Sequence, residues 1–212
     1  MTVKDDIRAA HRARRKAMDP AALDAAGEGI ARHGMVWAAA LPGTDPKTFA
    51  VYLGVGKEPP TLPLIKALHG AGHRVLLPVC EDDRQLSWVL WTPATAFHRS
   101  RFAPIDEPDG ERLDSSVVAS ADGIFLPATA VDGSGSRIGQ GGGYYDRLLE
   151  RLDGEGTRPP SIAVVFSEEV LPAGTIPAES FDQPVPAALT PDGEVRFSVT
   201  GVTEAGEPGS RQ

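Results

Sequence analysis

Three kinds of local structure follow one another in the segment GIFLPATAVDGSGSRIGQGGGYYDRLL (residues 123–149), and their order indicates the fold class. An apolar run of strand length (123–131) leads into a glycine-rich segment, and tyrosines and leucines then recur at helical spacing in YYDRLLERL (144–152). Within 139–143 every residue except Gln140 is glycine. Each glycine costs roughly 0.5–1 kcal/mol of conformational entropy relative to alanine in regular structure. We therefore expect a ligand to approach this backbone more closely than side chains would allow.

The rest of the chain alternates between strand and helix patterns. Helices are predicted at about 4–18, 20–40, 61–72 and 144–152, and strands at 49–55, 73–79, 85–92, 123–131, 161–166 and 194–200. Residues 93–114 read as an irregular polar loop. Such alternation predicts a three-layer α/β/α sandwich around a largely parallel or mixed sheet. Ligands of such sheets bind beyond the carboxyl ends of the strands, where the glycine segment begins.

Composition excludes several classes of protein. The 212 residues carry a net charge of −8, which argues against a nonspecific nucleic-acid binder. Cys80 is the single cysteine, so no intrachain disulfide can form, and no Cys/His cluster has zinc-ligand spacing. The N-terminus lacks the apolar core of a signal peptide, and no apolar run reaches the ~20 residues that span a bilayer. We expect a cytoplasmic monomer with one domain (1–202), a disordered tail (203–212), and neither nucleic acid nor membrane as partner.

The glycine segment fits neither of two familiar phosphate-binding motifs. A P-loop requires a lysine after its last glycine, which is absent, and the third glycine of a dinucleotide fingerprint is displaced. A flexible loop at a glycine-permissive helix entry therefore stays open as an explanation. Arg137 can pair with a phosphate. Asp146, in the first turn of the helix, can either hold magnesium through phosphates or complement the helix dipole.

The same segment resembles the hallmark of the 5-formyltetrahydrofolate cyclo-ligase (5,10-methenyltetrahydrofolate synthetase) family, roughly P-x-x-x-F-D-x-x-G-x-R-L-G-x-G-x-G-Y-Y-D-R. The matching residues are Pro127, Asp132, Gly135, Arg137, Gly139, Gly141, Gly143, Tyr144, Tyr145, Asp146 and Arg147. Other family segments follow in order along the chain: Lys4 and Arg8, then YLGVGKEPPTLPLIKAL (52–68), IDEP (105–108) and IPAESFDQPV (176–185). The resemblance implies a fold similar to the NagB/RpiA/CoA-transferase-like fold.

The resemblance also implies an activity: an ATP- and magnesium-dependent ligase that converts 5-formyltetrahydrofolate, a reduced folate, into 5,10-methenyltetrahydrofolate, ADP and phosphate. No covalent nucleophile is needed, and neither G-x-S-x-G nor H-E-x-x-H occurs in the chain. The resemblance assigns direct catalytic roles to Arg137 and Tyr145. The resemblance assigns ATP to Lys4, Arg8, Arg137, Gly139, Gln140, Gly141, Gly142, Gly143, Tyr144 and Tyr145. It assigns the folate to Leu53, Glu58, Gln140, Gly141, Gly142, Gly143 and Tyr144, and magnesium to Asp146 and Asp182.

Some of these residues have plainer explanations without the resemblance. Lys4 and Arg8 could lie on a solvated helix face, Glu58 in a surface loop and Asp182 in a turn. Trp88 and Trp91 are assigned to the core or its rim and not to the site.

The chain departs from the family pattern at Gln140, Gly142, Phe181 and Pro186, where aromatic, basic, histidine or aspartate residues are frequent. These departures leave open a diverged paralogue that keeps the nucleotide loop but binds another ligand or has a regulatory role. Sugar-phosphate or CoA-related chemistry would follow from the fold alone, which is a poor guide to function.

Overall fold

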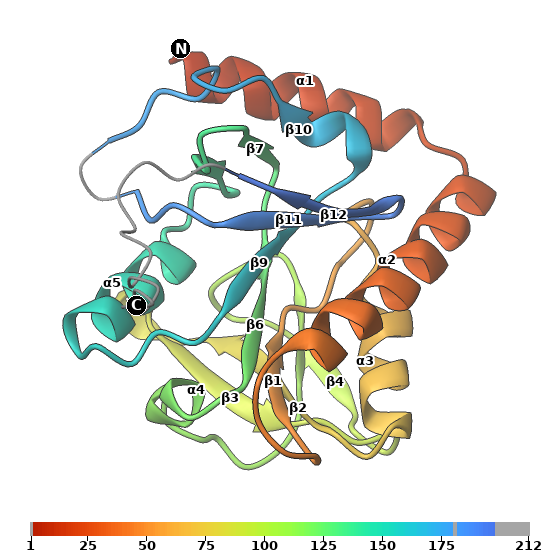
Figure 1. Cartoon of the computed structure of the whole chain (residues 1–212), viewed down its shortest axis with the longest axis vertical. Helices are drawn as coiled ribbons and strands as arrows, with labels where there is room; N and C mark the ends of the chain where they lie inside the picture. Colours follow the sequence, from red (N-terminus) through yellow and green to blue (C-terminus); the bar gives the residue numbers. More distant parts are fainter. Residues whose placement is uncertain (1, 180–181, 198–212) are drawn as a thin grey trace, which may run out of the picture.

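The computed structural model describes residues 2–179 and 182–197, and a seven-stranded sheet of order β12-β11-β9-β6-β1-β2-β3 forms its centre (Figure 1). The strands are β1 (Thr48–Val51), β2 (Arg74–Cys80), β3 (Leu86–Leu90), β6 (Gly123–Pro127), β9 (Ser161–Val164), β11 (Ala187–Thr190) and β12 (Gly193–Arg196). Neighbouring strands from β11 to β2 are parallel, whereas β12 and β3 pair antiparallel at the two edges. The prediction of a largely parallel sheet is confirmed.

Helices cover both faces of this sheet. Clusters of buried side chains join one face to α2 (Pro20–Ala40) and α3 (Leu62–Gly70), and the other to α4 (Ser116–Ala119) and α5 (Tyr144–Gly154). The first helix, α1 (Val3–Ala17), belongs to neither layer and lies across one end of the molecule, near β7 and β10 (Figure 1). The expected three-layer sandwich is therefore present, with α1 added at its end.

The helix starts follow from local sequence. Thr2 and Asp5 form a reciprocal capping box at the start of α1. Asp19 caps α2 by accepting from the amide of Ala22, and Pro20 occupies the first helical position, where its missing N–H is not needed. These signals explain why the predicted starts of both helices agree with the structure.

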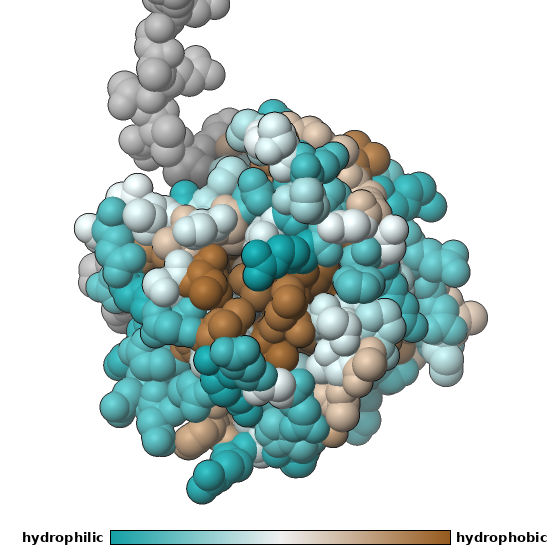
Figure 2. All heavy atoms as spheres, turned by 90° about the horizontal axis from the view of Figure 1, so that it is seen from below, coloured by the Kyte–Doolittle hydropathy of each residue, from teal (hydrophilic) through white to brown (hydrophobic). Residues whose placement is uncertain are grey.

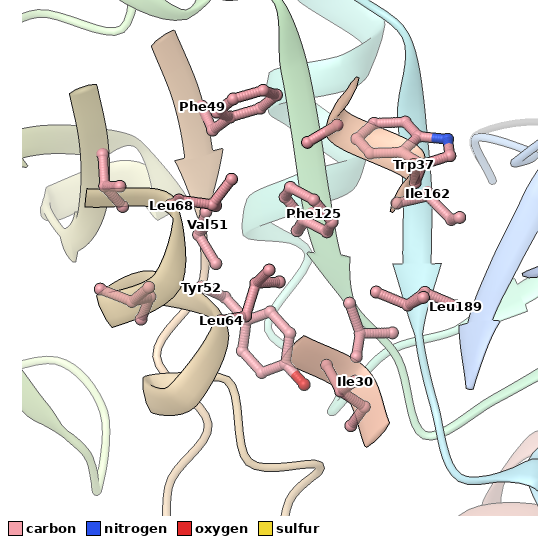
Figure 3. Packing of buried hydrophobic residues seen from close by; sticks show 14 of the residues in the cluster. Ile30, Trp37, Phe49, Val51, Tyr52, Leu64, Leu68, Phe125, Ile162 and Leu189 are labelled. Atoms are coloured by element: carbon pink, nitrogen blue, oxygen red, sulfur yellow. The ribbon is translucent and has the colours of Figure 1, made fainter. Parts of the chain in front are cut away.

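The core between the sheet and the α2/α3 layer contains large apolar side chains (Figure 3). Phe49 of β1 and Phe125 of β6 are fully buried, and the ring of Trp37 packs edge-on against Phe125 with centroids 4.8 Å apart. Central parallel strands are covered on both faces, which explains their nearly continuous apolar sequences. Trp88 and Trp91 are buried as well, as expected for core residues.

Two predicted segments differ from the structure. Residues 93–114 were expected to be irregular, yet β4 (Phe97–Arg99) and β5 (Asp106–Pro108) form an antiparallel hairpin there. The single strand expected at 123–131 is divided, because β6 ends at Pro127 and the chain then enters a second sheet. That sheet consists of β7 (Ala130–Asp132), β8 (Arg137–Ile138) and β10 (Val170–Leu171), in the order β10-β7-β8. Strands of two or three residues are too short to leave a clear local pattern in the sequence.

Two short 3₁₀ turns, η1 (Asp82–Arg84) and η2 (Ser167–Glu169), complete the described elements. The last predicted strand, 194–200, corresponds to β12, although residues 198–200 lie outside the described part of the chain. The tail predicted at 203–212 and the departure at Phe181 also lie outside it.

Figure 2 shows apolar side chains gathered near the centre of one face and surrounded by hydrophilic residues. Across the described residues the large apolar side chains with substantial exposure are Val3, Val36, Leu62, Leu90, Phe97, Phe102 and Val195.

None of the helices in the described ranges is both long enough and apolar enough to cross a membrane.

Candidate active site

A cavity of about 970 Å³ opens beyond the carboxyl ends of the central strands, between α1, the glycine segment and the loop at the tip of the β4–β5 hairpin. Every predicted site residue lines it: Lys4, Arg8, Leu53, Glu58, Arg137, Gly139, Gln140, Gly141, Gly142, Gly143, Tyr144, Tyr145, Asp146 and Asp182. The fold thus brings together residues up to 178 positions apart in the sequence. A volume of this size can hold more than one small molecule.

Gly141, Gly142 and Gly143 are each required for a different reason. Gly141 and Gly143 have φ angles of +100° and +74°, in the left-handed region that side chains disfavour. A Cβ atom on Gly142 would lie 3.0 Å from the ring of Tyr144. Gly143 occupies the N-cap position of α5 without a side-chain cap, so the first N–H groups of that helix are left for a ligand. Close approach of an anion is the chemistry that this arrangement favours.

Arg137 and Asp146 form an ion pair at the cavity wall. The Arg137 side chain is 2% exposed, and its Nη2 lies 2.5 Å from Oδ1 of Asp146 in the first turn of α5. Nη1 donates to the carbonyl of Pro127, while Nε has no partner among the described residues. Burial lowers the pKa of Arg137, and Asp146 partly offsets this. Asp146 therefore serves both as a counter-ion and as an acidic group at a helix N-terminus.

Lys4 of α1 holds the second predicted metal ligand. Its Nζ lies 2.6 Å from Oδ2 of Asp182 and 2.5 Å from Oε2 of Glu179. Burial alone would lower the pKa of Lys4, but the two carboxylates raise it overall. Asp182 and Asp146 are thus each paired with a cation that was predicted to contact ATP phosphates.

Two arginines of α1 donate hydrogen bonds to the glycine segment. Nε of Arg8 donates to the carbonyl oxygen of Gly139 at 3.0 Å, and Nη2 of Arg12 donates to Oε1 of Gln140 at 2.9 Å. Lys4, Arg8 and Arg12 follow one another at four-residue intervals, so they lie on one face of the helix. Arg12, unlike Lys4 and Arg8, was absent from the predicted site, although this spacing could have revealed it.

Glu58 reaches the opposite wall of the cavity. Its Oε2 accepts from the amide of Val55 at 3.2 Å, and its Oε1 accepts from Nε2 of Gln140 at 3.1 Å. Burial raises the pKa of Glu58, whereas the Val55 amide, Arg15 and Gln140 oppose that shift. A carboxylate held in this way can accept further hydrogen bonds from N–H groups of a ligand.

Tyr145 brings a buried hydroxyl to the cavity wall without a hydrogen-bond partner among the described residues. Burial raises the pKa of Tyr145 strongly, so the group is a neutral donor near neutral pH. Unpaired buried hydroxyl groups are costly. The hydroxyl of Tyr145 is therefore available to a ligand that enters the cavity.

The sequence profile of the 5-formyltetrahydrofolate cyclo-ligase family matches residues 1–191. A 5-formyltetrahydrofolate cyclo-ligase of Escherichia coli is 32% identical over 182 residues, which cover 85% of this chain and 96% of that protein. The chain belongs to this family. A cyclo-ligase of Mycolicibacterium smegmatis is 37% identical over 150 residues, covering 68% of this chain and 74% of the relative.

Solved structures agree on the fold of the cyclo-ligase family. The 5,10-methenyltetrahydrofolate synthetase of Aquifex aeolicus superposes with a TM-score of 0.69 at 23% identity, covering 96% of this chain and 97% of the other. The synthetase of Mycoplasma pneumoniae gives a TM-score of 0.66 at 18% identity, covering 89% of this chain and 98% of the other.

Several cavity-lining residues of this cyclo-ligase family member were absent from the predicted set. Phe102 and Ile105 reach the cavity from the β4–β5 hairpin, and Arg84 reaches it from the turn between β2 and β3. Cys80 also lines it, and burial raises the pKa of its thiol to about 12, which disfavours the reactive thiolate. Glu107 of the IDEP segment is buried and accepts from the amide of Cys80 at 2.8 Å. That contact supports the cavity wall from outside the predicted site.

Proposed function

We propose that this protein is a 5-formyltetrahydrofolate cyclo-ligase that uses ATP and Mg²⁺ to form 5,10-methenyltetrahydrofolate. The observation that carries the proposal is the single cavity lined by every residue that the family pattern assigns to nucleotide, folate or metal. The names of the curated relatives support the same reaction. A cytoplasmic, monomeric protein without nucleic-acid or membrane partners remains our expectation.

The chemistry requires activation of a poor leaving group. The formamide oxygen of the substrate attacks the γ-phosphorus of ATP, and the bond from that phosphorus to the β,γ-bridging oxygen breaks to release ADP. The neighbouring folate nitrogen then attacks the activated carbon, loses its proton, and closes the ring, and the C–O bond breaks to release phosphate. Positioning and charge neutralisation supply most of the rate in phosphoryl transfer, so no protein nucleophile takes part.

The residues of the cavity divide into two groups under this proposal. Lys4, Arg8 and the glycine backbone would bind the phosphates, with Arg137 neutralising charge on the transferred group. Leu53, Glu58 and the segment 140–144 would hold the reduced folate. Tyr145 would donate its free hydroxyl to an oxygen near the reacting centre.

Asp146 and Asp182 would supply two carboxylates, which is a type and number of protein ligands that suits Mg²⁺. Across 2–179 and 182–197 no group of three or more His, Cys, Asp or Glu side chains could hold a metal ion by itself. Mg²⁺ is commonly bound by one or two carboxylates together with substrate phosphates and water, so the cavity fits that mode. When bound, Mg²⁺ would neutralise phosphate charge. Lys4 and Arg137 could then exchange their carboxylate partners for phosphate oxygens.

The test is turnover of the purified protein with 5-formyltetrahydrofolate, ATP and Mg²⁺, followed by the near-ultraviolet absorbance of the methenyl product. We expect product only when all three are present. A folded protein whose thermal midpoint rises with ATP but which forms no product would instead be the diverged paralogue that binds another ligand.

A further inference from the structure

Three side chains form a hydrogen-bonded chain across the mouth of the cavity. Arg12 of α1 donates to Oε1 of Gln140 through Nη2 at 2.9 Å and through Nε at 3.3 Å. Nε2 of Gln140 donates to Oε1 of Glu58 at 3.1 Å. These hydrogen bonds therefore connect the N-terminal helix α1, the glycine segment and the loop that precedes α3.

The chemistry of the three groups fixes the orientation of the Gln140 amide. A guanidinium only donates hydrogen bonds and a carboxylate only accepts them. The amide oxygen must therefore face Arg12 and its nitrogen must face Glu58. Without Arg12, the amide oxygen would lose both of its donors, and the side chain would be held only through its bond to Glu58.

Gln140 is also the single side chain between Gly139 and Gly143. A Cβ atom at the neighbouring Gly141 would meet nothing within 4 Å, so packing does not hold this part of the segment. Hydrogen bonds hold it instead: the contacts of the Gln140 side chain, the Arg8 bond to the Gly139 carbonyl, and a longer bond of 3.4 Å from Nη2 of Arg12 to the Gln140 carbonyl.

Several cationic side chains line a second pocket together with Glu58. This smaller pocket of about 150 Å³ is lined by Arg12, Arg15, Lys16 and Lys57 together with Glu58 and Gln140. Arg15 attracts the Glu58 carboxylate, so without the Gln140 contact this attraction would no longer be opposed from the glycine segment. The Gln140 amide holds the carboxylate on the cavity side.

We infer that Arg12 and Gln140 are positioning residues for Glu58: Arg12 orients the Gln140 amide, and Gln140 holds the carboxylate where N–H donors of the reduced folate reach it. This inference rests on the proposed function, in which Glu58 binds the folate. It gives Arg12 a role toward the folate and not toward ATP.

The test compares Gln140→Leu, Arg12→Gln and the double variant, with Arg14→Gln as a matched control on an exposed part of the same helix. A hydrogen bond of this kind is worth about 1 kcal/mol. We expect the KM for 5-formyltetrahydrofolate to rise about fivefold in each single variant, with kcat changed less than about twofold. Because both substitutions break the same chain, the double variant should show about the same fivefold rise. Arg12→Lys, which keeps a donor, should stay within about twofold of the wild type.

Different outcomes would overturn the inference. A double variant with about a 25-fold rise, the product of two independent effects, would show that Arg12 does not act through Gln140. A rise in the KM for ATP without one for the folate would assign Arg12 to the nucleotide, and unchanged constants would remove the role altogether. Gln140 and Arg12 are exposed, so the variants should fold, and thermal midpoints equal to the wild type would verify this. Absence of wild-type turnover is a separate result, because it overturns the proposed function itself.

Discussion

Arg15 of α1 and Glu169 of η2 form a buried, two-point ion pair. Nε and Nη2 of the guanidinium lie 2.6 and 2.8 Å from Oε1 and Oε2 of the carboxylate, and the two side chains are 5% and 2% exposed. Nη2 also donates to the carbonyl of Ala128, and Oε2 accepts from the amide of Phe166. This pair fixes the position of α1, and therefore of the Lys4, Arg8 and Arg12 side chains above the cavity.

Replacement of Glu169 by glutamine should destabilise the protein by about 3 kcal/mol, because a buried guanidinium would lose its counter-charge. Urea denaturation measures the change in the free energy of unfolding. Asp153→Asn provides the control, since it removes a more exposed pair with Arg158 and should cost less than about 1 kcal/mol. Equal effects of the two substitutions would contradict the structural role given to Glu169.

The unfolding free energy should fall as the pH drops below about 6.5, in part because of His11 on the buried face of α1. Burial lowers the pKa of His11 from 6.5, and Arg14 and Arg15 of the same helix add to this, while Glu169 and Glu168 of η2 oppose it. A depressed folded-state pKa means that the unfolded chain binds the proton first, so this contribution is present above 6.5 and is lost as the pH falls through the folded pKa. Denaturation of wild type and His11→Gln at pH 7.5 and 5.5 would measure it. From pH 7.5 to pH 5.5, the unfolding free energy of His11→Gln should fall less than that of the wild type. An equal fall in both proteins would show that His11 does not contribute to this pH dependence.

Gly143→Ala should destabilise the protein by roughly 1–2 kcal/mol, because alanine is strained at a φ of +74°. Gly139→Ala is the matched control: its φ is not in the left-handed region, and the added Cβ would only meet Arg137 Nη1 at an ordinary 3.5 Å. Thermal denaturation of both variants gives the comparison. If Gly139→Ala proved the more damaging, backbone strain at the N-cap of α5 would not be the reason for the glycine.

Asp146→Asn should lower turnover roughly 100-fold, because it removes a carboxylate proposed for Mg²⁺ and the counter-ion of Arg137 at once. Asp153→Asn on the same helix, which does not line the cavity, should retain activity. Steady-state turnover over a range of Mg²⁺ concentrations would test the pair of variants. Full activity of Asp146→Asn would remove this residue from the proposed metal site.

The alternation of elements could be predicted because it depends on strong local patterns, whereas most of the cavity lining followed from the resemblance to the family pattern. The start of α2 follows from Asp19 and Pro20, and the glycine segment leads directly into α5. The β4–β5 hairpin left no comparable signal, since its strands are short and pair across a polar loop. As a result, Phe102 and Ile105 were absent from the predicted site.

Ion pairs between distant segments also could not be predicted. Lys4 pairs with Asp182 across 178 positions, and Arg15 with Glu169 across 154. The run of cations from Arg12 to Lys16 contains several candidates for a functional role. Which of them face the cavity is decided by the docking of α1 through Arg15, and this docking depends on Glu169.

Isotope labelling tests directly whether the formyl oxygen of the substrate is phosphorylated. The protein would be incubated with ATP, Mg²⁺ and 5-formyltetrahydrofolate labelled with ¹⁸O in the formyl group, and the phosphate released would be examined by mass spectrometry. Phosphorylation of that oxygen predicts one ¹⁸O atom in each phosphate formed together with the methenyl product. Methenyl product accompanied by unlabelled phosphate, or no product from folded protein, would contradict it.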